Sequence, residues 1–369
     1  MTTADARPGR GTRAGARLSL LIGTIAVLAA CGGQQALPAA PRLTAPAASP
    51  ATAARPGPHG TPGAAAGGIA GGLAALPAPA ALAPFSLPAP AGQGHWKPAG
   101  RRVNGRAAVY VTALVPPGGK QPAGVAWMDT RLLSARLYSG SRSPGRGPYR
   151  YTAPVRPAQA AALVAVFNGG FMMKDARGGY YTEHRVVYPL RRGAASLVIG
   201  AGGSVTVGAW GSDVSMTPAV VSVRQNLMPL VAGGRPTAAA GSGWRAWGST
   251  CGAASCAADV PGIEHQWRSG LGVTADGGLV YAAGPALDPL QLAWLLARAG
   301  VVRGMQLDIN PNWPVFATYQ PAAARGLGAP SNGRRLIPAT VQGPATFFEP
   351  SWARDFVTMS ARLPRQAEG

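Results

Sequence analysis

Hydrophobic residues after position 96 occur in short runs that are separated by glycine, proline and polar residues. Short runs rich in valine, alanine, leucine and tyrosine, bounded by turn-forming residues, indicate β-strands. Two longer stretches, 196–210 and 270–284, each contain two apolar runs around a glycine turn and predict β-hairpins, the second with Asp276-Gly277 at its turn. We predict single strands at residues 107–115, 124–130, 162–171, 185–190, 301–309 and 355–362.

One segment, residues 288–300 (DPLQLAWLLARAG), has the pattern of a helix. Asp288 is a favourable N-cap, Pro289 suits the first helical position, and Gly300 suits the left-handed position that ends a helix. Together the elements predict a strand-rich α+β domain with a mixed sheet and few helices, without fixing the order of the strands. The expected apolar stripe of the helix consists of Leu292, Leu295, Leu296 and Ala299.

Residues 1–31 have the pattern of an export signal. Arginines at positions 7, 10, 13 and 17 precede an uncharged apolar segment, 18–30, which is too short to span a bilayer comfortably. Cys31 follows Leu28-Ala29-Ala30, as in the lipobox of bacterial lipoproteins, in which the cysteine is acylated. An ordinary secretory signal with a chance cysteine is the alternative. We favour a lipoprotein that lipid on Cys31 anchors to the outer face of the cytoplasmic membrane, in the cell envelope.

Residues 32–96 are dominated by alanine, proline and glycine and have no sustained period of 2 or 3.6. Such a segment cannot bury enough apolar area to offset the entropy lost on ordering, so we predict a disordered linker. The remaining residues, 97–369, are enough for one large domain, which we expect.

The formal net charge of +21 at first indicates a nucleic-acid-binding protein. Only three of the 34 basic residues are lysines, the arginines are scattered, and no nucleic-acid-binding motif is present. We therefore do not expect a nucleic-acid partner. A positive surface outside the membrane favours anionic envelope polymers or phosphorylated sugars as ligands.

Two cysteines, Cys251 and Cys256, enclose the short segment CGAASC. In an oxidising compartment they could close a small loop, worth about 2 kcal/mol by chain entropy. A metal site is less favourable because His265 is the only nearby partner and would give at most three ligands. We predict a local disulfide. Asp308 and Asn310 alone do not make a calcium site, and we expect no metal or cofactor.

Asp308 stands at the end of the strand predicted at 301–309, directly after the predicted helix. The end of a strand that a helix feeds is a natural place for a binding crevice, and Pro311 prevents the strand from continuing. A carboxylate there could be held by neighbouring amides and still face a ligand. The alternative is that Asp308 caps the following turn, as aspartate before Asn-Pro often does.

Two further clusters contain groups that bind sugars or phosphates. Asn168 is followed by Gly169 and Gly170 at the end of another predicted strand, and glycines let backbone N–H groups approach an anion or a sugar closely. A plain tight turn is the alternative. Arg268 lies directly before a predicted hairpin, and its guanidinium could grip two phosphate oxygens. A solvated surface arginine is the alternative in that case.

In this order the three clusters resemble the phosphodiester glycosidase family, which includes the mannose 6-phosphate uncovering enzyme. Members have an Asn-Gly-Gly-Phe-Phe-like strand end, an Arg-Thr/Ser-Ala/Gly-x-Gly strand with a following "DG" turn, and a helix that leads into Leu-Asp-Gly-Gly-Gly-Ser. The resemblance covers roughly residues 162–319 and includes the strand at 355–362. The counterparts here are NGGF at 168–171, QNLMPLVAGGRP at 225–236, RSGLGVTADG at 268–277 and LDIN at 307–310.

The resemblance implies hydrolysis of a sugar-1-phosphodiester at the anomeric carbon. Ordinary glycosidases need two carboxyl groups because an alkoxide leaving group must be protonated. A phosphomonoester is a far weaker base, so a cationic clamp can replace the general acid. We therefore assign Asp308 as the nucleophile or the base that activates water, and Arg268 to the leaving phosphate. Asn168, Gly169 and Gly170 are expected to bind sugar hydroxyls or phosphate oxygens.

The family's glycine-rich loop after the aspartate is replaced here by INPNW. We expect Asn310, Asn312 and Trp313 to bind the substrate with side-chain donors and a stacking surface. A non-catalytic envelope lipoprotein that binds a glycan or anionic polymer through the same crevice is the alternative function, and a serine hydrolase is disfavoured because no Gly-x-Ser-x-Gly motif occurs. Reserve acid/base candidates, each with a structural hydrogen bond as the alternative, are Glu183, His184 and His265.

Overall fold

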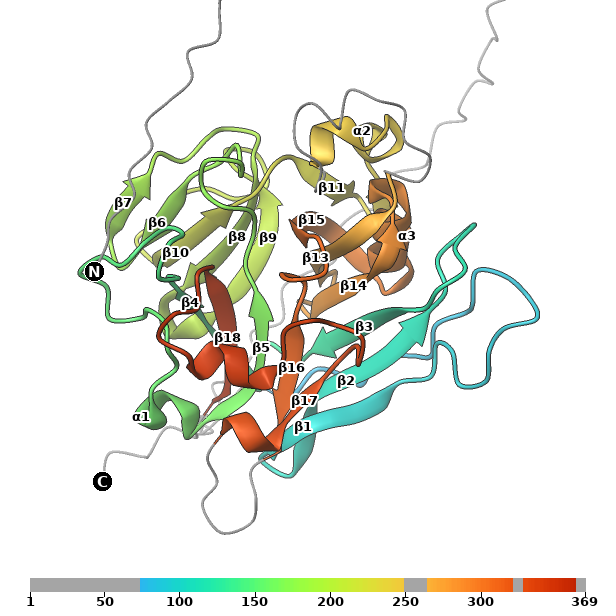
Figure 1. The fold of residues 1–369 in the computed structure, drawn as a ribbon, viewed down its shortest axis with the longest axis horizontal. Helices are drawn as coiled ribbons and strands as arrows, with labels where there is room; N and C mark the ends of the chain where they lie inside the picture. The colour runs from blue at the N-terminus through green and yellow to red at the C-terminus, as the bar shows by residue number, and fades with distance from the viewer. Residues whose placement is uncertain (1–73, 249–263, 321–327, 363–369) are drawn as a thin grey trace, which may run out of the picture. The chain divides into compact units, whose positions relative to one another are not determined.

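The computed structural model describes residues 74–248, 264–320 and 328–362 (Figure 1). They belong to one compact unit that spans residues 68–369. The predicted export signal with Cys31, most of the predicted linker, and the predicted disulfide between Cys251 and Cys256 lie outside the described residues. Among the described helices, none has the length and apolar character needed to cross a membrane.

The largest sheet has eight strands, and α3 (Pro289–Arg298) packs against five of them. Figure 1 shows α3 beside this sheet. In order across the sheet the strands are β1 (Lys97–Val103), β2 (Arg106–Leu114), β3 (Ala123–Met128), β14 (Leu279–Leu287), β13 (Gln266–Thr274), β15 (Val301–Ile309), β11 (Pro229–Ala232) and β12 (Arg235–Pro236).

Two five-stranded sheets complete the described fold, together with the short helices α1 (Pro157–Ala160) and α2 (Ala238–Gly241). One sheet has the order β7 (Arg185–Tyr188), β6 (Tyr180–Thr182), β10 (Val220–Gln225), β8 (Ala195–Gly200) and β9 (Val205–Ala209). The other has the order β17 (Gly333–Arg335), β16 (Phe316–Tyr319), β5 (Leu163–Asn168), β18 (Phe356–Ala361) and β4 (Leu133–Tyr138).

The strand-rich α+β prediction is confirmed, and a strand is present at each predicted site. The helix begins as predicted, because the Asp288 side chain accepts a hydrogen bond from the Gln291 backbone N–H at 2.7 Å. It ends before Gly300, which has a φ of 85°. The four residues of the predicted apolar stripe are all buried. The hairpin at 270–284 forms between β13 and β14.

The predicted mixed sheet is wrong, since every ladder between named strands of the described residues is antiparallel. Helices commonly connect parallel neighbours, but the helix of this domain does not. Here α3 carries the chain from β14 past β13, and β15 then pairs with β13. The two strands that α3 connects are therefore not hydrogen-bonded to each other.

Residues 74–96 form neither helix nor strand, but they pack on the domain. Leu76 is 4% exposed, and its backbone N–H donates to the Asp129 carboxylate at 2.8 Å. The Trp96 indole N–H donates to the Ala80 carbonyl at 2.8 Å. The packed part of the chain thus begins before Lys97, where the domain was predicted to start. Alanine- and proline-rich composition does not reveal a segment that is ordered by contacts with a distant surface.

Candidate active site

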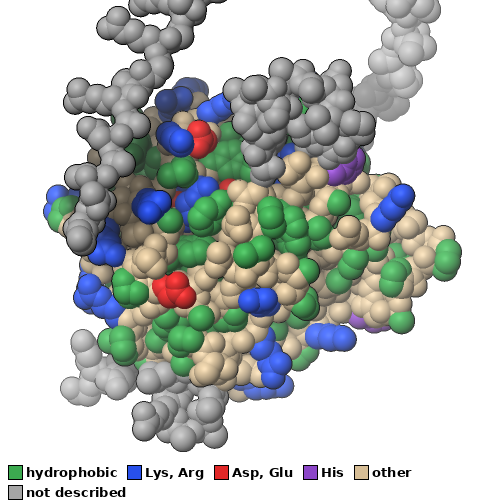
Figure 2. Space-filling view, viewed as in Figure 1, with side chains coloured by type: hydrophobic (Ala, Val, Ile, Leu, Met, Phe, Trp, Pro, Cys, Tyr) green, Lys and Arg blue, Asp and Glu red, His purple; other side chains and the backbone are tan. Residues whose placement is uncertain are grey.

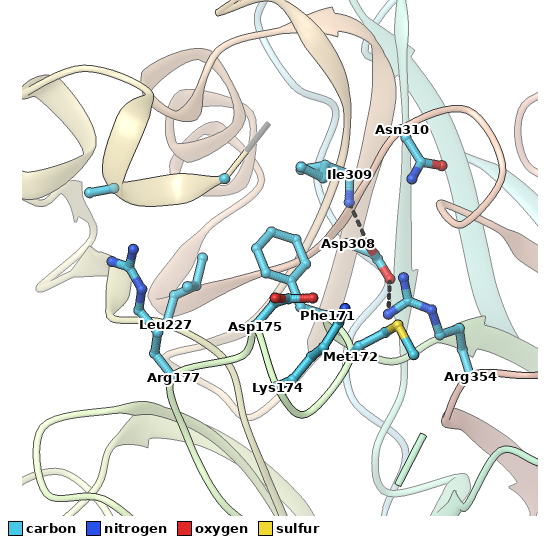
Figure 3. Close-up of a pocket in the computed structure, with 12 residues that line it drawn as sticks. Phe171, Met172, Lys174, Asp175, Arg177, Leu227, Asp308, Ile309, Asn310 and Arg354 are labelled. Atoms are coloured by element: carbon cyan, nitrogen blue, oxygen red, sulfur yellow. Dashed lines mark hydrogen bonds and ion pairs between the residues drawn. The ribbon is translucent and has the colours of Figure 1, made fainter. Parts of the chain in front are cut away.

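The three sheets contribute to one pocket of about 390 Å³, which is large enough for a small ligand. It lies where β15 ends, where the chain leaves β5 and β10, and where the chain approaches β18 (Figure 3). Its lining residues are Phe171, Met172, Lys174, Asp175, Arg177, Leu227, Ala246, Gly248, Asp308, Ile309, Asn310 and Arg354.

Asp308 lines this pocket but is only 2% exposed. One of its carboxylate oxygens, Oδ1, accepts a hydrogen bond from the Ile309 backbone N–H at 2.8 Å. The other, Oδ2, has no hydrogen-bond partner among the described residues. Burial raises the pKa of Asp308 from 3.8 to about 7, against the lowering effects of the Arg354 charge and of the Ile309 bond. At neutral pH the pocket therefore holds a carboxyl group that can both accept and release a proton.

The guanidinium of Arg354 is the cation that faces Asp308. Its Nη1 lies 3.4 Å from Asp308 Oδ2, and Figure 3 shows the two groups pointing toward each other. The guanidinium also lies over the Trp313 ring, 4.4 Å from the ring centroid. Trp313 in turn packs edge-on against Trp352, with 5.6 Å between the ring centroids. These two indoles restrict the position of the arginine beside the carboxylate.

Three more charged residues come from the loop that follows β5. Lys174, Asp175 and Arg177 are exposed and line the pocket. Within the part of the chain that the structure describes, Lys174 and Arg177 make no ion pair or side-chain hydrogen bond with the protein. They are therefore available to an anionic ligand. On the face shown in Figure 2, basic side chains are spread out rather than gathered in a stripe, as the sequence suggested.

Asn168 does not reach the pocket. Its side chain is 1% exposed, and its Oδ1 accepts hydrogen bonds from the Tyr281 hydroxyl at 2.8 Å and the Val315 N–H at 3.0 Å. Its Nδ2 donates to the Gly169 carbonyl at 2.8 Å and to Ser269 Oγ at 3.1 Å. All four hydrogen-bonding positions of the amide are used within the protein, so the predicted contact with a sugar or phosphate is not available.

Gly169 and Gly170 are needed for close packing of the protein itself, and neither of them lines the pocket. A Cβ on Gly169 would lie 2.0 Å from a carboxylate oxygen of Asp355, and one on Gly170 would lie 2.6 Å from Oδ1 of Asn226. The Gly169 N–H donates to the Asp355 carbonyl at 2.8 Å. Asp355 is itself held by a buried ion pair with Arg224, at 2.8 Å. The predicted role of the two glycines in substrate binding is therefore replaced by a structural one.

Arg268 is also structural. It is fully buried and does not line the pocket. Its Nε donates to the Leu287 carbonyl at 2.8 Å, Nη1 donates to Gln306 Oε1 at 3.0 Å, and Nη2 donates to the Glu264 carbonyl at 3.2 Å. Burial lowers its pKa to about 10. The prediction that Arg268 faces Asp308 is wrong because side chains alternate along a strand, and it is Ser269 that contacts the Asp308 backbone, at 3.1 Å.

The INPNW segment reaches the pocket only in part. Asn310 lines it and has a φ of 72°, and its Oδ1 accepts a hydrogen bond from the Asn312 N–H at 2.9 Å. Asn312 is exposed and lies outside the pocket lining. Trp313 is half-buried and supports Arg354. Of the three predicted substrate-binding residues in this segment, the structure therefore brings only Asn310 into the pocket.

None of the reserve acid/base candidates lines the pocket. The Glu183 carboxylate accepts hydrogen bonds from the backbone N–H groups of Arg150 and Tyr151, at 2.8 and 2.9 Å. His184 adjoins it on the turn between β6 and β7. His265 lies 3.2 Å from the Glu264 carboxylate. For Glu183, the two hydrogen bonds from backbone N–H groups agree with the alternative, which was a structural role.

Sequence reasoning missed Arg354 and the charged loop. Arg354 stands two residues before β18, and β18 pairs with β5, so that the arginine arrives beside the end of β5. Lys174, Asp175 and Arg177 follow the NGGF strand end directly, which was a usable signal. Nothing in the sequence relates Arg354 to Asp308, because their proximity depends on how two different sheets lie against each other.

No family model matches this chain, and no curated protein matches it. Among solved structures, the chain is similar to the catalytic domain of zebrafish N-acetylglucosamine-1-phosphodiester α-N-acetylglucosaminidase, auto-inhibited by its pro-peptide. That match has 14% identity and a TM-score of 0.41, and covers 73% of this chain and 88% of the other. A hypothetical protein from Synechocystis matches with 13% identity and a TM-score of 0.39, over 72% of this chain and 64% of the other. Both likenesses are distant, so the chemistry of the pocket has to follow from its own residues.

Proposed function

We propose that this protein hydrolyses a sugar-1-phosphodiester, breaking the bond between the anomeric carbon and the phosphate oxygen. The observation that carries the proposal is the buried Asp308 carboxylate in the pocket, whose Oδ2 faces Arg354 and has no hydrogen bond within the described residues. The motifs LDIN and NGGF, which resemble those of phosphodiester glycosidases, meet beside this pocket. The predicted export signal and lipobox favour the cell envelope as the place of the reaction.

In the proposed reaction, water attacks the anomeric carbon and gives a proton to the Asp308 carboxylate. The bond from that carbon to the phosphate oxygen breaks, and its electron pair stays on the oxygen, which gives the free sugar and a phosphate monoester. Arg354 and Lys174 stabilise the negative charge on the leaving phosphate. Because a phosphate monoester is a weak base, its departure does not require a general acid. The raised pKa of Asp308 suits a base that works near neutral pH.

The full chain, incubated with a panel of sugar-1-phosphodiesters, should release sugar and phosphate monoester in equal amounts. Asp308→Asn should lower kcat by about 10²- to 10⁴-fold, as expected for the loss of a positioned base. Arg354→Gln should lower kcat/KM, because it removes charge stabilisation of the leaving group. The matched controls are Glu349→Gln and Arg185→Gln, since both residues are exposed and lie outside the pocket lining.

The outcome that contradicts hydrolysis is equally specific. If diesters bind with the same affinity to wild type and to Glu349→Gln but no monoester is released, the protein is the alternative non-catalytic binding module. If release occurs and Asp308→Asn leaves it unchanged, the reaction takes place elsewhere, and the assignment of this pocket is wrong.

A further inference from the structure

The charged loop after β5 is anchored beside the pocket by hydrogen bonds at both of its ends. At its start the Phe171 N–H donates to Asn226 Oδ1 at 3.0 Å, and at its end the Gly179 N–H donates to Gln225 Oε1 at 2.8 Å. Both acceptors are fully buried side chains at the end of β10. The loop backbone is therefore pre-positioned before any ligand arrives, which reduces the entropy cost of binding.

Arg177 is the unusual residue of this loop. Its φ is 50°, in the left-handed region that glycine occupies most readily and in which other residues are strained. Gly178 and Gly179 follow it directly, yet neither of them has a positive φ. Among the described residues no acidic side chain pairs with Arg177, although its side chain lines the pocket. A strained backbone that presents an unpaired cation to a pocket indicates a ligand contact.

Arg177 and Asp308 lie at opposite ends of the pocket. In Figure 3 the Arg177 guanidinium stands away from Asp308 and Arg354, with Leu227 and Phe171 between them. Arg354 and Lys174 can thus neutralise a phosphate that lies between them, and Arg177 is not needed for this. Phe171 and Leu227 give the surface between the two ends an aromatic ring and an apolar side chain, which suit the face of a sugar ring, and the Asp175 carboxylate also lies there (Figure 3).

We infer that the sugar of the substrate carries an anionic group of its own, a phosphate or a carboxylate remote from the anomeric carbon, which Arg177 binds. The inference rests on the proposed function, since it places the anomeric phosphate at Arg354 and Lys174 beside Asp308. The sugar then lies over Phe171 and Leu227, and its second anionic group reaches Arg177. The substrate class is an acidic sugar joined through its anomeric carbon to a phosphodiester.

Binding to the full chain tests this inference without any need for turnover. The probes are glucose 1-phosphate, glucose 1,6-bisphosphate and glucuronic acid 1-phosphate, measured by titration calorimetry at one ionic strength. The two probes with a second anionic group should bind about tenfold more tightly than glucose 1-phosphate, as expected for one charge-assisted contact. Comparison of the bisphosphate with the glucuronate separates a phosphate from a carboxylate as the second group.

Arg177→Gln should reduce the ratio of the bisphosphate and monophosphate affinities to near one, and Arg185→Gln should leave the ratio at its wild-type value. Equal affinities for all three probes in the wild type would overturn the inference, and so would a ratio that Arg177→Gln does not change. Hydrolysis of neutral-sugar diesters at the same kcat/KM as acidic ones would also overturn it, while the proposed hydrolysis stands. Tighter binding of both acidic probes without hydrolysis of any diester would support the acidic-sugar site and contradict the proposed reaction.

Discussion

The Asp308 carboxylate lies 3.4 Å from the Arg354 guanidinium, although β15 and β18, the strands at which the two residues lie, belong to different sheets. Asp308 belongs to β15 near its C-terminal end, and Arg354 precedes the first residue of β18. Their contact leaves Asp308 Oδ2 and Arg354 Nη1 without a hydrogen bond among the described residues. Buried polar atoms normally have hydrogen-bond partners. Two such atoms that lack them suit a site in which a bound ligand supplies the missing hydrogen bonds.

The pH dependence of hydrolysis should reflect the state of Asp308. If the carboxylate is the base, kcat/KM rises with pH and reaches half its maximum near the Asp308 pKa of about 7. Because the Arg354 charge lowers this pKa, Arg354→Gln should move the rising limb to higher pH. A pH–rate profile of each protein measures the shift. A limb that stays in place, or that moves to lower pH, would contradict the role given to the pair.

Stability should also depend on Asp308, with a defined sign. Its pKa is raised on folding from 3.8 to about 7, so between these values the folded state binds more protons than the unfolded state. This group therefore makes the free energy of unfolding fall as pH rises through that window, by on the order of 4 kcal/mol in total.

Asp308→Asn removes this contribution, so the variant should gain stability relative to wild type between pH 4 and 7, with no further gain above about pH 8. Denaturant unfolding at several pH values measures the difference. A difference that is the same at every pH would show that Asp308 titrates normally in the folded protein.

Asp175 is a second carboxyl group in the pocket, and the effect of its removal distinguishes two mechanisms. With a phosphate monoester as leaving group no general acid is needed, so Asp175→Asn should lower kcat by less than about tenfold. An ordinary two-carboxylate glycosidase would instead lose activity strongly in both variants. Parallel measurements of kcat for Asp175→Asn and Asp308→Asn distinguish the two, and comparable losses would refute the single-carboxylate reaction.

Asn168 should affect folding rather than substrate binding. Asn168→Ala leaves the buried Tyr281 hydroxyl and the Val315 N–H without their acceptor, which should lower the free energy of unfolding by about 1–3 kcal/mol. The matched control is Asn312→Ala, because Asn312 is exposed and its side chain has no bond within the described residues. A normal free energy of unfolding together with a raised KM would restore the original assignment of Asn168 to the substrate.

The sequence by itself determined one helix, two hairpins, several strands and one catalytic candidate. The helix from Pro289 to Arg298 was predictable because its N-cap, its first proline and its apolar stripe all lie within one short segment. Asp308 was predictable because a carboxylate at the end of a buried run is conspicuous in a chain with only 13 acidic residues. β10, which was not predicted, is short and ends in two buried polar residues, Arg224 and Gln225.

Only the tertiary structure decided which residues share the pocket. Arg268 and Asn168 have chemistry suited to a phosphate or a sugar, but their hydrogen bonds are used by protein groups that come from distant parts of the chain. Arg354 looks ordinary in the sequence and becomes the partner of Asp308 because β18 pairs with β5. Local patterns fix how a segment folds, whereas the partners of a side chain depend on strand pairing between segments far apart, which residue type and spacing alone do not encode.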